Sequence, residues 1–250
     1  MTVPALHYYN MGDGVTAFST MRQGGYSQGN YGEFNINCYC GDDANAIHQN
    51  RAALCRVLGI ADDSLIMPHQ VHLTQVVVIG DEIPDLEGVD ALMTDQSGVC
   101  IGVSTADCIP VLLYDPEHRA VCAIHAGWRG TVQRIVEKAL TKMNDVYGTK
   151  PADILAQIGP GISIDSFEVG DEVYEAFAQA GFPMDIISQR MEKWHIDLPL
   201  CNRLQLEVMG VPAKQIDVSD VCTFKQSETY FSARRLGINS GRIFTGILLR

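Results

Sequence analysis

Apolar positions along this chain follow two different periods, and each period predicts a different kind of element. Ile47, Leu54 and Leu58 recur at helical spacing, with Asp42-Asp43 before them as a candidate N-cap and Gly59 after them. Aspartate side chains accept hydrogen bonds from the first free N–H groups of a helix, and glycine tolerates the left-handed backbone that ends one. The pattern therefore predicts a helix that ends at Gly59.

Helical spacing recurs in three later segments. The apolar residues between 132 and 146 predict one helix that ends near Gly148, and Asp171 is expected to cap a second. Pro199 can open a third helix in its first turn, and Gly210 can close it. At least four helices are therefore expected.

Short apolar runs between the helical segments predict strands. They are TQVVVIG (74–80), VCIGVST (99–105), ILAQIG (154–159), IDVSDVC (216–222), YFSAR (230–234) and RIFTGILL (242–249). The glycine-rich segment 18–37 predicts further short strands separated by turns. Because strands joined by short turns are frequent, the pattern favours the α+β class (mixed α/β), with mixed sheets covered by helices.

The segment TADCIPVLLYDPEHRAVCAIHAGWRG (105–130) contains two apolar runs around a polar break. It predicts a hairpin with its tip at 117–118, so that Pro110 lies opposite His125. Side chains alternate between the two faces of a strand, which places Cys108 on the same face as His125. The two residues become diagonal neighbours, about 7–8 Å apart at the backbone. The hairpin is therefore expected to bring a thiol and an imidazole together.

Two histidines before the run VVVIG offer a third ligand. His69 and His72 are three positions apart and do not share a strand face, so His72, which is closer to the strand, is the candidate. One Cys and two His from three segments form the ligand set of a catalytic zinc, which lowers the pKa of bound water to about 7. Spacing alone leaves open the alternative that His72, Cys108 and His125 are ordinary packing or surface residues.

A candidate anion site follows the hairpin. Gly127-Trp128-Arg129-Gly130 leads into a predicted helix, where free backbone N–H groups and the guanidinium of Arg129 can bind phosphate. An ordinary helix start with Arg129 on the surface explains the same residues equally well. Arg22 and Asn35 are further candidates for binding phosphate or substrate, and Asp107 is a candidate for proton transfer.

Composition limits the classes of function. The net charge of −12 disfavours a nucleic-acid partner, because phosphate backbones require a basic face. No apolar stretch is long enough to span a membrane, and the N-terminus lacks the pattern of a secretory signal, so we expect a cytoplasmic protein. Eight scattered cysteines without paired CxxC motifs indicate mostly buried thiols rather than disulfides.

Five motifs in order along the chain resemble the YfiH family of laccase-domain proteins. They are QVH (70–72), TADCIPVLL (105–113), HAGWRG (125–130), IGPGI (158–162) and FEVGDEV (167–173). The resemblance covers almost the whole chain, so residues 1–250 are expected to form one domain. It implies an αββα sandwich of mixed sheets that resembles the catalytic domain of cytotoxic necrotizing toxins.

The resemblance also implies a metal ion and a reaction. In the family a zinc or copper ion is held by the residues that correspond to His72, Cys108 and His125, and we expect zinc here, with copper as the alternative. The implied activity is phosphorolysis of adenosine, inosine and methylthioadenosine, with a purine nucleoside and inorganic phosphate as partners. Adenosine deamination is implied as a second reaction. Tyr39 stands where a histidine is common in the family, so specificity is expected to differ if that position contacts substrate.

Other functions remain open from the sequence. Family members are also named polyphenol oxidases, but a multicopper laccase needs many histidine ligands in HxH pairs, and this chain has seven histidines and no HxH. Cys108 as a nucleophile with His125 as its base would give a hydrolase or a peptidoglycan editing factor. A nucleotide-binding protein without turnover is a further alternative, and a homodimer stays open.

Overall fold

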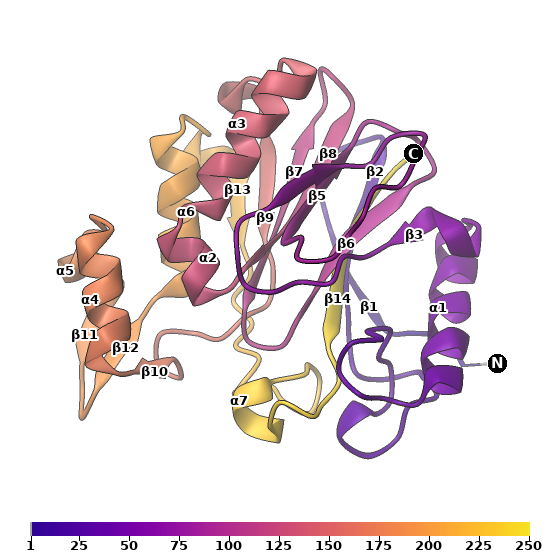
Figure 1. Cartoon of the computed structure of the whole chain (residues 1–250), viewed down its shortest axis with the longest axis horizontal. Helices are drawn as coiled ribbons and strands as arrows, with labels where there is room; N and C mark the ends of the chain where they lie inside the picture. The colour runs from indigo at the N-terminus through magenta and orange to yellow at the C-terminus, as the bar shows by residue number, and fades with distance from the viewer. Residues whose placement is uncertain (1) are drawn as a thin grey trace.

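Two mixed β-sheets packed face to face form the centre of the molecule (Figure 1). The computed structural model describes residues 2–250, and within them the larger sheet has six strands. Their order is β13 (Ile216–Val218), β9 (Leu155–Ile158), β7 (Ile109–Asp115), β8 (Ala120–Ala126), β5 (Ala91–Thr94) and β4 (Val76–Val78). The outer pairs β13/β9 and β4/β5 are parallel, whereas the inner pairs are antiparallel. We call this the β7/β8 sheet.

The second sheet, called the β6/β14 sheet, has five strands within the same described residues. Their order is β1 (Leu6–Tyr9), β2 (Val15–Thr20), β14 (Ile243–Leu249), β6 (Cys100–Thr105) and β3 (Leu65–Ile66). Apolar side chains from both sheets fill the space between them, including Ile101, Val103, Leu112, Val121 and Ile247. Burial of this layer holds the strand ends that carry the site in fixed positions.

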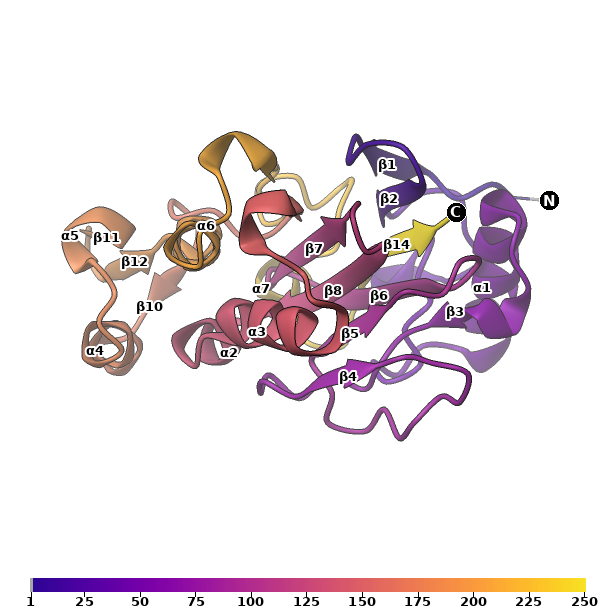
Figure 2. The ribbon, with the colours of Figure 1, turned by 90° about the horizontal axis from the view of Figure 1, so that it is seen from above.

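Helices cover the outer face of each sheet (Figure 2). α1 (Ala44–Leu58) packs on the β6/β14 sheet, and α2 (Trp128–Val132), α3 (Ile135–Tyr147) and α6 (Leu198–Val208) pack on the β7/β8 sheet. The layers run helix, sheet, sheet, helix. The fold is therefore a mixed α/β arrangement with mixed sheets, as the sequence predicts.

Shorter elements extend the fold at its edges. A small sheet of β10 (Glu168–Val169), β12 (Trp194–Ile196) and β11 (Ser188–Arg190) lies beside α4 (Asp171–Gln179) and α5 (Met184–Ile187). α7 (Ala233–Leu236) precedes β14, and 3₁₀ turns span Gly29–Tyr31, Asp62–Ser64, Pro151–Asp153 and Ala213–Gln215. Across residues 2–250, no helix combines the length and the apolar character that crossing a membrane requires.

The hairpin forms with the predicted register. Asp115 pairs with Ala120, and Pro110 pairs with His125, between β7 and β8. Every residue of both strands is buried, and a slip of one position would move each side chain to the opposite face. Packing on both faces therefore fixes the register.

Most helix ends also form where the sequence predicts them. The Asp43 carboxylate caps α1 by accepting a hydrogen bond from a backbone N–H, and Gly59 ends the helix with a left-handed φ of 69°. Gly148 ends α3 in the same way, with a φ of 76°. The prediction for α4 is wrong by one residue, since Gly170 is the N-cap and Asp171 is the first helical residue.

Two other predictions about secondary structure differ from the structure. The helix expected over 132–146 forms as α3 but begins only at Ile135, because Arg134 adopts a left-handed φ of 64° and separates it from the short helix α2. The run YFSAR (230–234) forms no strand, because the Ser232 side chain instead caps α7. In both cases a local backbone feature overrides the apolar pattern.

The glycine-rich segment 18–37 also differs from its prediction, since beyond Thr20 it contains turns rather than strands. Polar side chains hold its backbone in place of a sheet. The buried amide of Asn50 accepts a hydrogen bond from Tyr26 N–H and donates to the carbonyl of Asn35. These hydrogen bonds fix the segment against α1, and residues 37, 39 and 40, which end and follow it, lie at the candidate site.

Candidate metal centre

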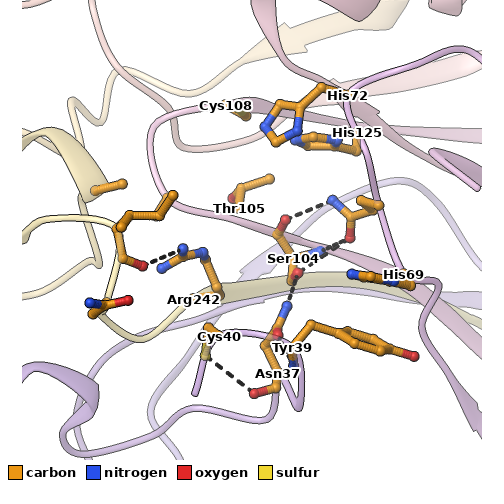
Figure 3. A pocket seen from close by; sticks show the side chains of 15 residues that line it. Asn37, Tyr39, Cys40, His69, His72, Ser104, Thr105, Cys108, His125 and Arg242 are labelled. Carbon is orange, nitrogen blue, oxygen red and sulfur yellow. Dashed lines mark hydrogen bonds between the residues drawn. The ribbon is translucent and has the colours of Figure 1, made fainter. Parts of the chain in front are cut away.

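A cavity of about 480 Å³ lies at one end of the two sheets, next to the end of β6 and the start of β7 (Figure 3). Its wall is formed by five parts of the chain, through residues 37, 39, 40, 69, 70, 72, 104–106, 108, 125, 233, 238, 239 and 242. Segments far apart in the sequence therefore meet there. A cavity of this size can hold a small molecule.

His72, Cys108 and His125 converge at one end of this cavity (Figure 3). Their candidate ligand atoms all lie within 4.8 Å of one another. Ligand atoms around a tetrahedral zinc are about 3.5 Å apart, so small side-chain movements would close the three around an ion. His125 is buried, Cys108 is half-buried and His72 is exposed, which leaves one side open to the cavity. The donor set fits a zinc ion that keeps one position for water or substrate.

Gly127 allows this close approach. A Cβ atom at this position would lie 2.9 Å from Cδ2 of His72 and 3.1 Å from Sγ of Cys108. Both distances are shorter than ordinary van der Waals contact, so any other residue would displace the two side chains. The glycine that follows the HA of HAGWRG thus has a steric role beside the candidate ligands.

Asp90 holds two of the candidate ligands. Its Oδ1 lies 2.7 Å from Nδ1 of His125 and accepts a hydrogen bond of 2.9 Å from the backbone N–H of His72. Its Oδ2 accepts from the N–H of Leu73 at 2.8 Å, and the carboxylate is fully buried. Because the ionised carboxylate is only an acceptor, His125 carries its proton on Nδ1 and presents Nε2 for a metal. The same contacts hold the left-handed backbone of His72, whose φ is 64°.

Charge coupling between the ligands favours the metal-binding form of the thiol. Burial raises the pKa of Cys108, but the charges and hydrogen bonds of His125 and His72 outweigh it and lower that pKa to about 6. Burial lowers the pKa of His125, but Cys108 and Asp90 outweigh it and raise that pKa to about 9. Without a metal, the centre therefore holds a thiolate beside an imidazolium at neutral pH.

The opposite wall of the cavity contains an aromatic pair. The rings of Tyr39 and His69 are stacked, with centroids 4.0 Å apart and planes 16° from parallel. Glu87 fixes the imidazole, since its carboxylate lies 2.7 Å from Nδ1 of His69. His69 lines the cavity but is not part of the three-residue cluster of His72, Cys108 and His125.

The other predicted site residues do not gather at this cavity. Arg129 is exposed, with its guanidinium 4.4 Å from the ring centroid of Trp128. Arg22 donates to the backbone carbonyls of Gly32 and Ser227. Asn35 is fully buried and donates to Asp42 at 2.8 Å. Asp107 accepts hydrogen bonds from the Thr223 hydroxyl and from Arg234 N–H. The phosphate-binding role of Arg22, Asn35 and Arg129 stays a prediction.

Three residues near the centre were not singled out from the sequence. Asp90 lies in an ordinary strand-like run, and nothing in its neighbourhood marks it as a partner of His125. Thr105 lies within the TADC motif, and Arg242 directly precedes the last strand. Both line the cavity because β6 pairs with β14, and that pairing is not visible in the sequence.

Comparison with known proteins assigns the chain and its fold to a family. The chain belongs to the family described as multi-copper polyphenol oxidoreductase laccase, whose model matches residues 16–250. The crystal structure of the hypothetical protein YfiH from Bacillus licheniformis superposes with a TM-score of 0.91 and 29% identity. That match covers 94% of this chain and 93% of the other. The resemblance to the YfiH family is confirmed.

Two relatives with assigned names are more similar in sequence. A purine nucleoside phosphorylase from Bacteroides thetaiotaomicron is 47% identical, over 94% of this chain and 92% of the relative. A protein from an unknown prokaryotic organism, named adenosine deaminase RL5, is 44% identical, over 94% of both chains. Relatives of similar identity thus have names for two different reactions.

Proposed function

We propose that this protein is a metal-dependent purine nucleoside phosphorylase that acts on adenosine, inosine and methylthioadenosine, with adenosine deamination as a second reaction. The observation that carries the proposal is the convergence of His72, Cys108 and His125 on an open cavity, in a chain 47% identical to a relative named purine nucleoside phosphorylase. The substrates would be a purine nucleoside and inorganic phosphate. The single-domain organisation of residues 1–250, the likeness to the toxin domain and a homodimer stay predictions.

The proposed cofactor is zinc, held by His72, Cys108 and His125, with copper as the alternative. When bound, zinc supplies a Lewis acid that can polarise an oxygen or a water molecule. The residues of the chain prepare that position: Asp90 orients His125, and the lowered pKa of Cys108 provides a thiolate near neutral pH. The family description names a multicopper laccase, but seven histidines without an HxH pair are too few for several copper centres.

Deamination of adenosine is supported by the relative named adenosine deaminase RL5. The same cavity would then hold the nucleoside without phosphate. A cysteine hydrolase is the remaining alternative, because the thiolate of Cys108 beside His125 resembles an activated nucleophile. Alkylation of Cys108 in the presence of zinc distinguishes the two hypotheses. In a metalloenzyme bound zinc would block the reaction, whereas the thiolate of a cysteine hydrolase would still react.

Chromatography of the products tests the proposal. Zinc-loaded protein is incubated with adenosine, with and without phosphate, beside Cys108→Ala and a matched variant, Cys38→Ala, at an exposed thiol outside the cavity. We expect adenine only with phosphate, with loss of adenine in Cys108→Ala and normal release in Cys38→Ala. Inosine formed without phosphate would identify deamination. Absence of both products from folded, zinc-bound protein would contradict the purine assignment.

A further inference from the structure

A buried hydroxyl without a hydrogen-bond partner lies in the wall of the cavity. Thr105 is 1% exposed, and within residues 2–250 its Oγ1 has no hydrogen-bond partner. A buried polar group in this state destabilises the folded protein, so its presence requires an explanation. Because the residue lines the cavity, a bound ligand can supply the missing partner.

Strand pairing places this hydroxyl between the metal ligands and a cation. Thr105 is the last residue of β6, three positions before Cys108, and it pairs with Ile243 of β14. Arg242 directly precedes Ile243, so its side chain reaches the same part of the wall. Figure 3 shows Thr105 between Cys108 and Arg242.

The charge of this wall favours an anion. Arg242 is the lining residue with a permanent charge, and among the residues described at the cavity none is an aspartate or glutamate. Its Nη1 donates to the carbonyls of Ser240 and Gly241, and its Nη2 donates to the carbonyl of Ile238. Those neutral partners fix the guanidinium plane without neutralising it, and no hydrogen bond within residues 2–250 uses Nε. In a chain of net charge −12, Arg242 thus provides a fixed positive charge in the wall of this cavity.

We propose that the Thr105 hydroxyl and the Arg242 guanidinium bind the inorganic phosphate that is consumed in phosphorolysis, beside the metal centre. The assignment rests on the proposed function for its role in turnover. Phosphate oxygens accept hydrogen bonds from a hydroxyl and from guanidinium N–H groups, and a charged acceptor makes both bonds strong. Arg129, the candidate from the sequence, is exposed and lies outside the wall of this cavity.

This position suits the reaction. An oxygen of monohydrogen phosphate forms a bond to C1′ of the ribose while the bond from C1′ to the purine nitrogen breaks. The purine keeps that electron pair and gains the phosphate proton, so ribose 1-phosphate and the free purine are the products. Holding phosphate within the cavity makes the attack effectively intramolecular.

Calorimetric titration of zinc-loaded protein with inorganic phosphate tests the site without requiring turnover. We compare wild type, Thr105→Val, Thr105→Ser and Arg242→Gln with Arg190→Gln, a matched variant at an exposed arginine on β11. Loss of a hydrogen bond to a charged group weakens binding about tenfold, so Thr105→Val and Arg242→Gln should each raise the Kd for phosphate by at least that factor. Thr105→Ser and Arg190→Gln should bind like wild type.

The melting temperature distinguishes a ligand-binding hydroxyl from a structural one. Valine has the shape of threonine without the unpaired hydroxyl, so Thr105→Val should unfold at the same or a higher temperature than wild type. Arg242→Gln removes hydrogen bonds to three carbonyls and is expected to be less stable, which makes Thr105→Val the decisive variant. A lower melting temperature with unchanged phosphate affinity in Thr105→Val would overturn the proposal.

Steady-state kinetics gives the second readout. In Thr105→Val we expect the KM for phosphate to rise about tenfold and the KM for adenosine to stay close to the wild-type value. If only the KM for adenosine rises, Thr105 contacts the nucleoside and the proposal is wrong. If Arg129→Gln abolishes phosphate binding and Arg242→Gln does not, the anion binds at the helix start instead. If no adenine forms but phosphate binding still depends on Thr105 and Arg242, the anion site stands and the phosphorylase assignment fails.

Discussion

The two walls of the cavity are built in different ways. His72, Cys108 and His125 are held by strand register and by the buried carboxylate of Asp90. The opposite wall, at Tyr39, consists of side chains from turns between elements. A substitution in the wall with the metal ligands disturbs several ligands together. A substitution in the wall at Tyr39 affects one side chain at a time. The second wall is therefore where we expect a substitution to change substrate preference while the metal ligands stay in place.

The two walls also differ in how they affect the pKa of a cysteine thiol. Cys108 and Cys40 both line the cavity. Two histidines lower the pKa of Cys108 to about 6 against the effect of burial, whereas burial dominates at Cys40 and raises its pKa. The wall that contains His72 and His125 therefore favours an ionised thiol, and the opposite wall, at Tyr39, favours a neutral one.

The largest expected effect follows from breaking the support of the metal wall. In Asp90→Asn an NH₂ group takes the place of one carboxylate oxygen. Because NH₂ is a donor, it cannot accept the hydrogen bonds that Asp90 accepts from His125, His72 and Leu73. His125 and His72 then lose the side chain that holds both of them. We expect zinc affinity to fall 10- to 100-fold, measured by competition with a chelator. Asp13→Asn, at an exposed carboxylate, is the control. Equal zinc affinity in Asp90→Asn and wild type would show that the ligands need no such support.

The pH dependence of alkylation sharpens the contrast between the two thiols. Because the pKa of Cys108 is depressed, its thiolate predominates above about pH 6 and is lost as the pH falls below that value. In metal-free protein at pH 7, iodoacetamide should modify Cys108 about tenfold faster than Cys40, because the larger thiolate fraction outweighs the lower nucleophilicity. Peptide mass spectrometry measures both rates. Equal rates at pH 7 would contradict the coupling to His125.

A smaller effect is expected on the opposite wall. Tyr39→His replaces an exposed ring that stacks on His69 and borders the cavity. If the purine lies against this wall, we expect the ratio of kcat/KM for adenosine and inosine to change about fivefold, the size of one stacking contact. Zinc content, measured on the same protein by atomic absorption, should stay the same. A loss of zinc would mean that the two walls are not independent.

The smallest effect is expected from a methyl group between the ligands. Gly127→Ala places a Cβ against His72 and Cys108, but His72 is exposed and can move aside. We expect zinc affinity to fall by about threefold, because a ligand that must shift binds the ion less well. Gly80→Ala adds a methyl group in open space and serves as the control. Unchanged zinc affinity in Gly127→Ala would show that the ligand positions have more freedom than the structure indicates.

The sequence was most informative where contacts are local. Alternating side chains and a short turn were sufficient to place Cys108 and His125 on one face of a hairpin, and the structure confirms that register. The caps of α1 were equally local, since Asp43 and Gly59 act on their own helix. A helix split by the backbone of Arg134 was not predictable, because apolar spacing does not report a left-handed residue.

The missing parts of the site depend on contacts between distant segments. Asp90 meets His125 because β5 pairs with β8, and Thr105 and Arg242 line the same cavity because β6 pairs with β14. No period within a single segment reports which strands become neighbours. The prediction of strands over 18–37 was wrong for a related reason. Asn50 of α1, which is distant in sequence, supplies hydrogen bonds that a sheet would otherwise provide.

The position of two ligands on one hairpin has a consequence for how the protein is assembled. Cys108 and His125 lie at the open end of β7 and β8, so closing a short loop brings them together early. His72 and Asp90 join only when β4 and β5 add to that hairpin. A metal ion would therefore meet two ligands in a partly folded chain and gain the third as the sheet completes, which couples metal loading to the order of folding.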